Sequence, residues 1–306
     1  RSVVGLLVVL CAFGFQSLAL KLGVVVTQMA AESQARVANT LERLAKENGW
    51  EVIVLNSKGS SETQLNQIEN LVEMRVDAII LVMGRVHEVR PGLEAAFAAG
   101  IPVVTVDSGY IPGIIADITC DNFVLGAKIS TYFVDMLGGT GNIIVFRYEK
   151  HHGTRKRGKV LDQVLSEYPG IKVLAEYTIV NPAKFIEETR SAMETFILRY
   201  GNQINGVWCA FDQLAFAVID VLQEYGLKNV IVVGVDGLEE AFRRIRAGVM
   251  TATAAQPFED MAAVAIDLIK KIVIDKIEIS TVAPRKIIYL DAPIVDQTNV
   301  AQFIKQ

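Results

Sequence analysis

The chain has 306 residues, of which 51% are hydrophobic and 21% charged, a composition typical of a globular protein with room for two ordinary domains. Its formal net charge of -4 at pH 7 argues against nucleic acid as a partner, because phosphate binding needs a basic face. We therefore expect a folded protein of two domains with no nucleic-acid partner.

The first residues of the chain differ from the rest. A positive first residue precedes an apolar stretch over 3–15, and Ser17 and Ala19 then give a small-x-small pattern. This order is typical of a secretory signal peptide, so we predict that residues 1–19 are removed and that the mature protein is periplasmic. An uncleaved anchor is the main alternative. Cys11 raises the question of lipid attachment, but the aliphatic pair before it lacks the small residue that lipoprotein processing prefers.

From residue 20 onwards, short apolar runs alternate with amphipathic stretches. The apolar positions Ala35, Ala38 and Leu41 have helical spacing and predict a helix over 33–48. The alternation predicts an α/β protein whose parallel sheets are covered on both faces. The strands expected in chain order are 22–26, 51–55, 78–82, 103–106, 142–146, 173–177, 206–209, 230–233 and 251–255.

One strand pattern occurs twice in the chain. The segment IPVVTVDSG ends its apolar run at Asp107, and VIVVGVDGL ends its apolar run at Asp236. Each is preceded by a strand and a helix that closes on glycine, the order of a right-handed parallel crossover. This repeat predicts two doubly wound parallel-sheet lobes, each of which presents a carboxylate at the carboxyl end of a strand.

Glycine-rich or proline-rich linkers are absent from the sequence, so the two lobes must be joined by ordered crossings. We place these crossings near 120–122, 256–257 and 283–284. They form a multi-crossing hinge that bends in one direction. The N-terminal lobe then comprises 20–121 plus 257–283, and the C-terminal lobe comprises 122–256 plus 284–306.

Polar side chains follow many of the expected strands. Ligands bind beyond the carboxyl ends of the strands in open parallel sheets, and a mixture of carboxylate, amide and guanidinium groups suits the hydroxyls of a sugar. Asp212 suits the role of a helix N-cap better than that of a ligand contact. Turn formation alone could explain an aspartate at position 107 or at position 236. It explains less well why an aspartate occurs at both Asp107 and Asp236. The strand-end residues are Thr27, Gln28, Asp107, Ser108, Arg147, Asp212, Asp236 and Gln256.

The segments LGVVVTQ, ITCDN, GTRKRG, VIVVGVDG and ATAAQP occur in this order at characteristic separations. Together they resemble the type I periplasmic sugar-binding proteins of ABC transporters, the group that includes ribose-binding protein. The resemblance covers the chain from Leu22 to about Pro293. It implies a monomeric receptor that closes two lobes around a monosaccharide or polyol and delivers it to a membrane permease.

The resemblance also implies which residues contact the ligand. In that family, four residues contact the sugar: the acid after the fourth strand, the second arginine of the R-x-R-G helix start, the acid of the VVGxDG strand and the glutamine before the last crossing. In this chain they correspond, in the same order, to Asp107, Arg157, Asp236 and Gln256. A guanidinium at that helix start can donate two hydrogen bonds to a pair of hydroxyls. The remaining basic residues of 150–159 are expected to be solvated.

The chain departs from the ribose-binding pattern at several positions. Ribose-like members stack the sugar between aromatic side chains just after the first strand, where this chain has Ala30 and Ala31. Phe211 replaces an asparagine of ribose binders, and Ser108 replaces an arginine. We therefore expect a ligand other than ribose. Aromatic surface could instead come from Tyr110, Tyr148, Phe185 and Phe211, and the residues expected to line the site are Asp107, Arg157, Asp236, Gln256, Phe211, Thr27, Tyr110 and Ser108.

Other signals do not indicate catalysis or a metal site. The glycine-rich stretch 138–142 is expected to form a turn, because it precedes a strand rather than a helix. The three histidines, His87, His151 and His152, lack metal-ligand spacing and are expected on the surface. Cys120 and Cys209 lie in apolar runs and are expected to be buried free thiols. No cofactor, metal or catalytic residue is predicted.

Two alternatives belong to other functional classes. The effector domains of LacI-type transcriptional regulators share this fold, but such a chain should open with a helix-turn-helix of about sixty residues. A sugar-acting enzyme could use paired carboxylates, although the strand-end residues contain no nucleophile with its base. We expect a binding protein rather than an enzyme.

Overall fold

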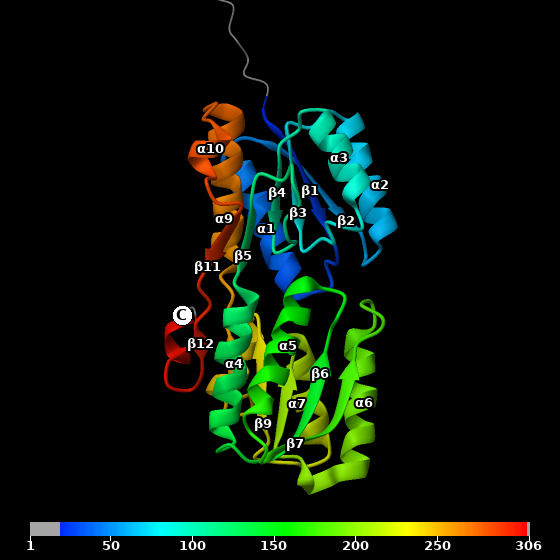
Figure 1. The fold of residues 1–306 in the computed structure, drawn as a ribbon, viewed down its shortest axis with the longest axis vertical. Helices are drawn as coiled ribbons and strands as arrows, with labels where there is room; N and C mark the ends of the chain where they lie inside the picture. Colours follow the sequence, from blue (N-terminus) through cyan, green and yellow to red (C-terminus); the bar gives the residue numbers. More distant parts are fainter. Residues whose placement is uncertain (1–18, 305–306) are drawn as a thin grey trace, which may run out of the picture.

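The computed structural model describes residues 19–304 as two α/β lobes stacked along the long axis of the molecule (Figure 1). Each lobe contains one six-stranded sheet, and helices cover the sheets. The predicted α/β architecture with two lobes dominated by parallel strands is confirmed. The predicted signal segment lies almost wholly outside the described residues, as does Cys11.

The sheet of the first lobe has the strand order β11-β5-β4-β3-β1-β2, and all its neighbouring pairs are parallel. The central strands are buried on both faces, which explains their nearly continuous apolar sequence. The strands are β1 (Lys21–Val26), β2 (Glu51–Asn56), β3 (Ala78–Val82), β4 (Val103–Val106), β5 (Asp117–Cys120) and β11 (Ile287–Leu290).

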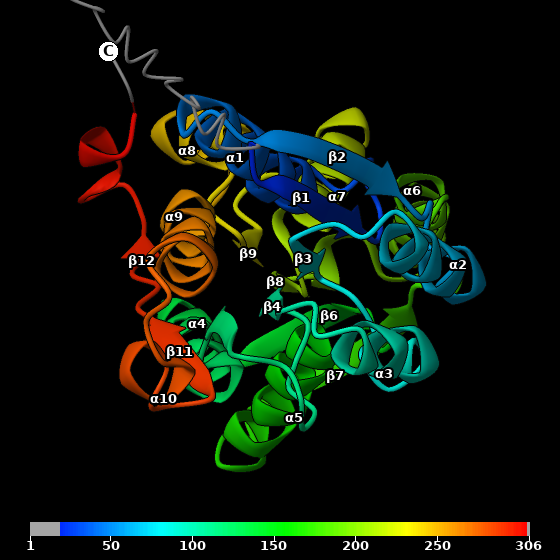
Figure 2. The ribbon, with the colours of Figure 1, turned by 90° about the horizontal axis from the view of Figure 1, so that it is seen from above.

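Helices pack on both faces of this sheet. Viewed from above, α1 and α9 lie on one side of the strands, and α2 and α3 lie on the other (Figure 2). Ser60 caps α2 by accepting a hydrogen bond from the backbone of Thr63 at 3.1 Å. The helices are α1 (Glu32–Glu47), α2 (Ser61–Glu73), α3 (Arg90–Ala98), α9 (Phe258–Ile269), its π-helical continuation Lys270–Ile274 and α10 (Ile279–Val282).

The second sheet has the order β12-β10-β9-β8-β6-β7, in which only the pair of β10 with β12 is antiparallel. Its strands are β6 (Gly141–Arg147), β7 (Ile171–Thr178), β8 (Gly206–Cys209), β9 (Ile231–Val235), β10 (Ala252–Ala254) and β12 (Ile294–Val295). Two helix pairs, α4 with α5 and α6 with α7, pack on it. The helices are α4 (Asn122–Met136), α5 (His152–Ser166), α6 (Phe185–Tyr200), α7 (Asp212–Glu224) and α8 (Glu239–Arg246), with 3-10 turns at Gly201–Gln203 and Val300–Gln302.

The chain passes between the lobes after β5, after β10 and after β11. The third crossing differs from our expectation at 283–284, which assigned residues 284–306 to the second lobe. In the structure β11 pairs with β5, so the first lobe continues to Leu290. A strand of four residues that gains its partner from a distant part of the chain gives no local signal of the sheet it joins.

The structure also tests the expectations for the cysteines and the glycine-rich stretch. Cys120 and Cys209 are buried free thiols, as predicted. Residues 137–139 form a turn between α4 and β6, where Gly138 and Gly139 have positive φ values, whereas 141–142 of the stretch expected as a turn already belong to β6. Within residues 19–304, no helix has the length and apolar character that crossing a bilayer requires.

Candidate functional site

The two repeated aspartates follow equivalent strands of the two lobes, and both have a positive φ angle. Asp107 follows β4 with φ 47°, and Asp236 follows β9 with φ 131°. A positive φ in a non-glycine residue costs on the order of 1–3 kcal/mol and often marks a functional site. In each lobe, the repeated sequence pattern therefore ends on an aspartate whose backbone is strained.

The Asp107 carboxylate is 2% exposed and is held by neighbours from the first hinge crossing. The Thr119 hydroxyl donates to Asp107 Oδ1 at 2.6 Å, and Asn122 Nδ2 lies 3.4 Å from the same oxygen. Both neighbours come from the ITCDN segment. Sequence reasoning used this segment for the resemblance but did not identify Thr119 or Asn122 as site residues.

Arg157 extends from α5 to Asn122, beside Asp107. Its Nη1 donates to Asn122 Oδ1 at 3.1 Å, and the side chain is buried. Close approach of α4 and α5 depends on Gly126, because a Cβ there would lie 2.9 Å from the Cα of Arg157. Gly153 has a similar role, because its Cβ would lie 2.9 Å from the side-chain amide of Asn122. These two glycines thus allow α5 to approach α4 and Asn122 closely enough for Arg157 to reach the site.

Asp236 and Gln256 form the other part of the site. Gln256 Nε2 donates to Asp236 Oδ1 at 3.0 Å, and its backbone N–H donates to the Asp236 carbonyl at 3.1 Å. Four buried side-chain atoms of the described residues have no hydrogen-bond partner, and two of them, Gln256 Oε1 and Arg157 Nε, belong to this site. Buried polar groups are normally paired, so an unpaired acceptor and an unpaired donor indicate a place for a ligand.

The charged groups of the site influence one another. Burial raises the pKa of Asp236 to about 8, although the Arg157 charge acts against this rise. Burial therefore favours the protonated form of the Asp236 carboxyl at neutral pH. Burial also acts to raise the pKa of Asp107, but the two histidines when they are protonated, the Thr119 hydrogen bond and the Arg157 charge outweigh it and leave the pKa below its usual value. With both imidazoles neutral, the Thr119 hydrogen bond and the Arg157 charge still favour the carboxylate. Asp107 is therefore the anion of the site and Arg157 its cation.

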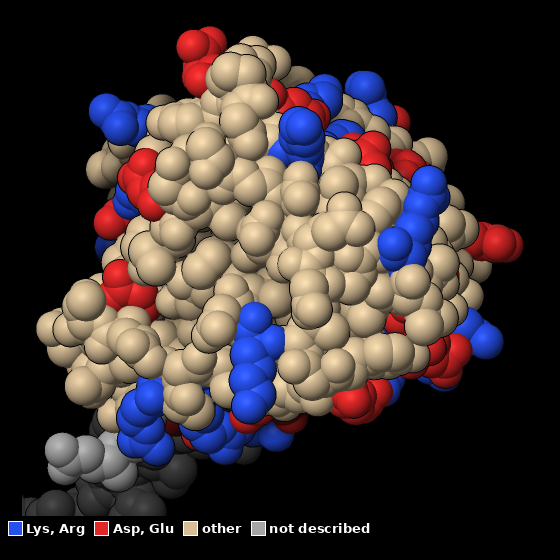
Figure 3. Space-filling view, turned by 90° about the horizontal axis from the view of Figure 1, so that it is seen from below, with Lys and Arg blue, Asp and Glu red and all other residues tan. Residues whose placement is uncertain are grey.

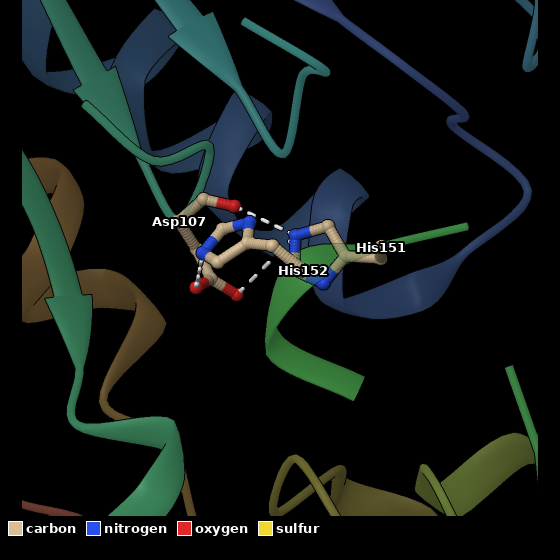
Figure 4. A group of neighbouring side chains, drawn as sticks. All are labelled: Asp107, His151 and His152. Atoms are coloured by element: carbon tan, nitrogen blue, oxygen red, sulfur yellow. Dashed lines mark hydrogen bonds and ion pairs between the residues drawn. The ribbon is translucent and has the colours of Figure 1, made fainter. Parts of the chain in front are cut away.

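His151 and His152 lie in the site, and our expectation that they are surface histidines is wrong (Figure 4). His151 Nε2 is 2.7 Å from the Asp107 carbonyl oxygen, and His152 Nε2 is 3.8 Å from Asp107 Oδ1. Burial lowers the pKa of His151, and burial together with His151 lowers the pKa of His152 to about 3. Both imidazoles are thus neutral at pH 7. Because α5 of one lobe meets β4 of the other, spacing along the chain could not reveal this contact.

Thr27 and Ser108 have their hydroxyls occupied within the first lobe. Thr27 Oγ1 donates to the Met83 carbonyl at 2.9 Å and accepts from Gln64 Nε2 at 2.8 Å. Ser108 Oγ donates to the Leu81 carbonyl at 3.0 Å and accepts from the Gly84 backbone at 2.8 Å. Both side chains therefore hold strand ends in position.

Two other strand-end residues have structural partners. Arg147 forms ion pairs with Asp162 at 2.5 Å and Glu176 at 3.0 Å. Asp212 is the first residue of α7 rather than its N-cap, so the expected capping role is wrong. Its buried carboxylate instead accepts from the Leu238 backbone at 2.9 Å and from Thr253 Oγ1 at 2.7 Å. It therefore fixes the loop after Asp236.

Aromatic side chains cluster in the second lobe. Phe211 packs edge-on against Phe185, with ring centroids 5.5 Å apart, and against Tyr148 at 6.2 Å. Tyr110 lies in the first lobe, where it is partly buried against the apolar core. The structure thus joins three of the four aromatics that the sequence singled out.

Contacts between the lobes show a closed arrangement. In addition to the His151 bond, Arg36 Nη1 of α1 donates to the Gly237 carbonyl at 2.9 Å. The Glu32 backbone donates to Gln213 Oε1 at 3.0 Å. These contacts bring the strand-end loops of both lobes together around Asp107, Arg157, Asp236 and Gln256. The site therefore lies between the lobes.

Comparisons with known proteins place this architecture in a family. The family model described as periplasmic binding protein domain matches residues 22–277. A xylitol-binding protein of Mycolicibacterium smegmatis is 32% identical over 218 residues, which is 71% of this chain and 62% of that protein. The match thus spans somewhat under two thirds of that relative. A D-apiose import binding protein of Actinobacillus succinogenes is 30% identical over 75% of this chain and 74% of its own length.

Solved structures share the fold. A solute-binding protein of an ABC transporter from Mycobacterium smegmatis with bound glycerol has a TM-score of 0.83 at 25% identity, covering 94% of this chain and 98% of its own. A solute-binding protein from Agrobacterium vitis with bound allitol has the same TM-score, 0.83, at 22% identity, covering 94% of this chain and 98% of its own. The chain therefore belongs to the periplasmic binding protein family, in the type I sugar-binding group that its motifs resemble.

Proposed function

We propose that this protein is the solute-binding component of an ABC transporter, which captures a monosaccharide or polyol between its lobes in the periplasm and delivers it to a membrane permease. The relatives support this class of ligand, because their names and bound molecules include xylitol, D-apiose, allitol and glycerol. The role is binding and release rather than turnover.

The unpaired Arg157 Nε and Gln256 Oε1 carry this proposal. A hydroxyl group both donates and accepts, so one polyhydroxylated ligand can satisfy the donor and the acceptor together. Asp107 adds a charged acceptor, and protonated Asp236 adds a donor. One anion, one cation and one neutral acid leave little net charge at the centre, which suits an uncharged chain of hydroxyls.

The aromatic cluster provides the complementary apolar surface. The C–H groups of a sugar or polyol pack favourably on aromatic rings. Phe211 is partly exposed at the start of α7 and is supported by Tyr148 and Phe185, so it offers such a surface in the lobe that carries Arg157 and Asp236. We propose Phe211 as the ring that contacts the ligand.

A thermal-shift screen followed by calorimetry tests the proposal. We expect at least one of xylitol, D-apiose, D-allose, allitol, ribose and myo-inositol to raise the melting temperature and to bind with one site per chain, because a ligand of the folded state stabilises it by mass action. Replacing Arg157 with Lys should weaken binding about 10- to 100-fold, because lysine lacks the planar donor fork.

The matched control is Lys159→Gln, an exposed position on the same helix. It should leave the affinity unchanged. Absence of binding across the panel would contradict the proposed ligand class. Consumption of a bound sugar, measured by chromatography after incubation, would contradict the proposed role and support an enzyme.

A further inference from the structure

A groove of about 450 Å³ lies between the lobes beside the proposed ligand site. It adjoins the site at two points. Ser108, the residue after Asp107, lines the groove, and so does His152, whose Nε2 is 3.8 Å from Asp107 Oδ1. The first lobe contributes 84–88 and 108–110 to its lining, and the second lobe contributes residues of 150–156. A molecule bound at Asp107 could therefore extend into the groove without leaving the cleft.

The groove is positively charged although the chain as a whole is negative. Among the described residues, the charged side chains that line it are Arg85, Lys150, Arg155, Lys156 and Glu88, which together carry a net charge of +3. The full chain carries a net charge of -4. The far end of the second lobe differs, because in surface view it is mostly uncharged, with a few Lys and Arg side chains on its face and carboxylates mainly toward its rim (Figure 3).

Three of these cations are not neutralised by carboxylates. Arg85 pairs with Glu88 at 2.9 Å, but Lys150, Arg155 and Lys156 form no ion pair with any residue of 19–304. Lys150 Nζ donates to a backbone carbonyl at 2.6 Å, and Arg155 Nη1 donates to another at 2.7 Å. Lys156 Nζ lies 5.3 Å from the centre of an aromatic ring. All three are available to an external anion.

The surrounding charge argues against a metal ion here. Asp107, His151 and His152 bring three ligand atoms within 4.8 Å of one another, a donor set that suits transition metals (Figure 4). However, His151 Nε2 already bonds the Asp107 carbonyl oxygen, and the charges of Arg155 and Arg157 act on the imidazoles. Nearby positive charges disfavour a divalent cation and favour an anion.

We propose that this cationic groove binds the carboxylate or phosphate group of an acidic sugar or polyol, whose hydroxylated part occupies the site at Asp107, Arg157, Asp236 and Gln256. The inference rests on the proposed function and narrows its ligand class. Lys150, Arg155 and Lys156 hold the anionic group, and the lack of a side-chain cap on α5 leaves the positive end of that helix facing the same region.

Calorimetry with matched ligands tests this inference. The neutral members are xylitol and ribitol, and the acidic members are xylonate, ribonate and the 5-phosphates of the two polyols. For at least one carbon skeleton, we expect an acidic form to bind at least 10-fold more tightly than the neutral form at low salt, with an advantage that falls as salt rises. Comparison of the carboxylates with the phosphates identifies which anionic group the groove prefers.

The double variant Arg155→Gln, Lys156→Gln should abolish this advantage and leave the affinity for the neutral polyol unchanged. Lys159→Gln, on the same helix outside the groove, should preserve it. Equal affinity for neutral and acidic forms would overturn the inference while leaving the proposed function intact, as would an advantage that survives the double variant. Absence of binding by every member would contradict both the inference and the proposed function.

Discussion

At the scale of single residues, the two aspartates that the sequence repeats have different ionisation states. The Thr119 hydrogen bond and the Arg157 charge favour the ionised form of Asp107, whereas burial favours the protonated form of Asp236 at neutral pH. Replacing Asp107 with Asn should therefore remove a charged acceptor and weaken ligand binding by about 2 kcal/mol, or roughly 30-fold. Asp236→Asn should change the affinity by only a few-fold, because an amide replaces a group that is already neutral.

Calorimetry on both variants at pH 7 measures this asymmetry. Thermal melts without ligand provide the control, since both variants must first be shown to fold. Equal losses for the two substitutions would mean that Asp236 is ionised in the folded protein.

The Asp236 pKa of about 8 also predicts how stability depends on pH. Between the ordinary pKa of an aspartate and pH 8, the folded state keeps a proton that the unfolded state loses, so stability falls as pH rises. Asp117 and Asp212, with pKa values of about 6, act in the same direction over a lower range. His151 and His152, whose pKa values are lowered, act in the opposite direction, mainly below about pH 7, because their imidazoles bind more protons in the unfolded state. A loss of stability between about pH 7 and pH 8 therefore belongs mainly to Asp236.

Urea unfolding at pH 7 and pH 8 tests this assignment. The wild type should lose stability across that interval, and Asp236→Asn should lose less. Parallel curves for the two proteins would contradict the raised pKa.

At the scale of elements, the packing of α4 against α5 sets the position of Arg157. Gly126→Ala places a Cβ 2.9 Å from the Arg157 Cα, so the helices must separate. We expect a loss of about 1–3 kcal/mol in stability together with weaker ligand binding. Gly158→Ala on α5 is the matched comparison, because its Cβ would lie 2.9 Å from Arg147 Nη1 and 3.7 Å from Glu149 Oε1, which are ends of side chains rather than backbone atoms.

Denaturant unfolding and calorimetry measure the two effects. The Gly158→Ala protein should keep both stability and affinity close to those of the wild type. If Gly126→Ala bound ligand normally, the depth of Arg157 would not depend on this contact.

The elements that the sequence predicted and those that it missed differ in a physical way. Strands such as β1 and β3 can be predicted from the sequence, because burial on both faces requires a long apolar run. The missed strands β5, β11 and β12 are short, and β11 is half exposed, so they depend on partners distant in sequence. Site residues brought together from distant parts of the chain were likewise not predictable from the sequence. Resemblance indicated Asp107 and Arg157, whereas the His151 contact arises only when the lobes meet.

At the scale of the whole molecule, contacts between the lobes stabilise the closed form. Arg36 bonds the Gly237 carbonyl across the cleft and also pairs with Glu259. Arg36→Ala should shift the equilibrium toward an open form and lower ligand affinity, because binding must then supply more of the free energy of closure. Arg43→Ala is the control, since Arg43 pairs with Glu47 on the same helix and with no other residue of 19–304.

Small-angle scattering measures this equilibrium without ligand. The Arg36→Ala protein should have a larger radius of gyration than the Arg43→Ala protein, and ligand should reduce the difference. Identical radii for the two variants would show that this contact does not influence closure.

The central claim is that one hydroxylated ligand binds between the lobes at Asp107, Arg157, Asp236 and Gln256. A crystal structure of the complex with the tightest ligand from the screen tests it most directly. We predict density in the cleft, with hydroxyls within hydrogen-bond distance of Arg157 Nε and Gln256 Oε1. A ligand bound elsewhere, with these two atoms still unpaired, would contradict the account.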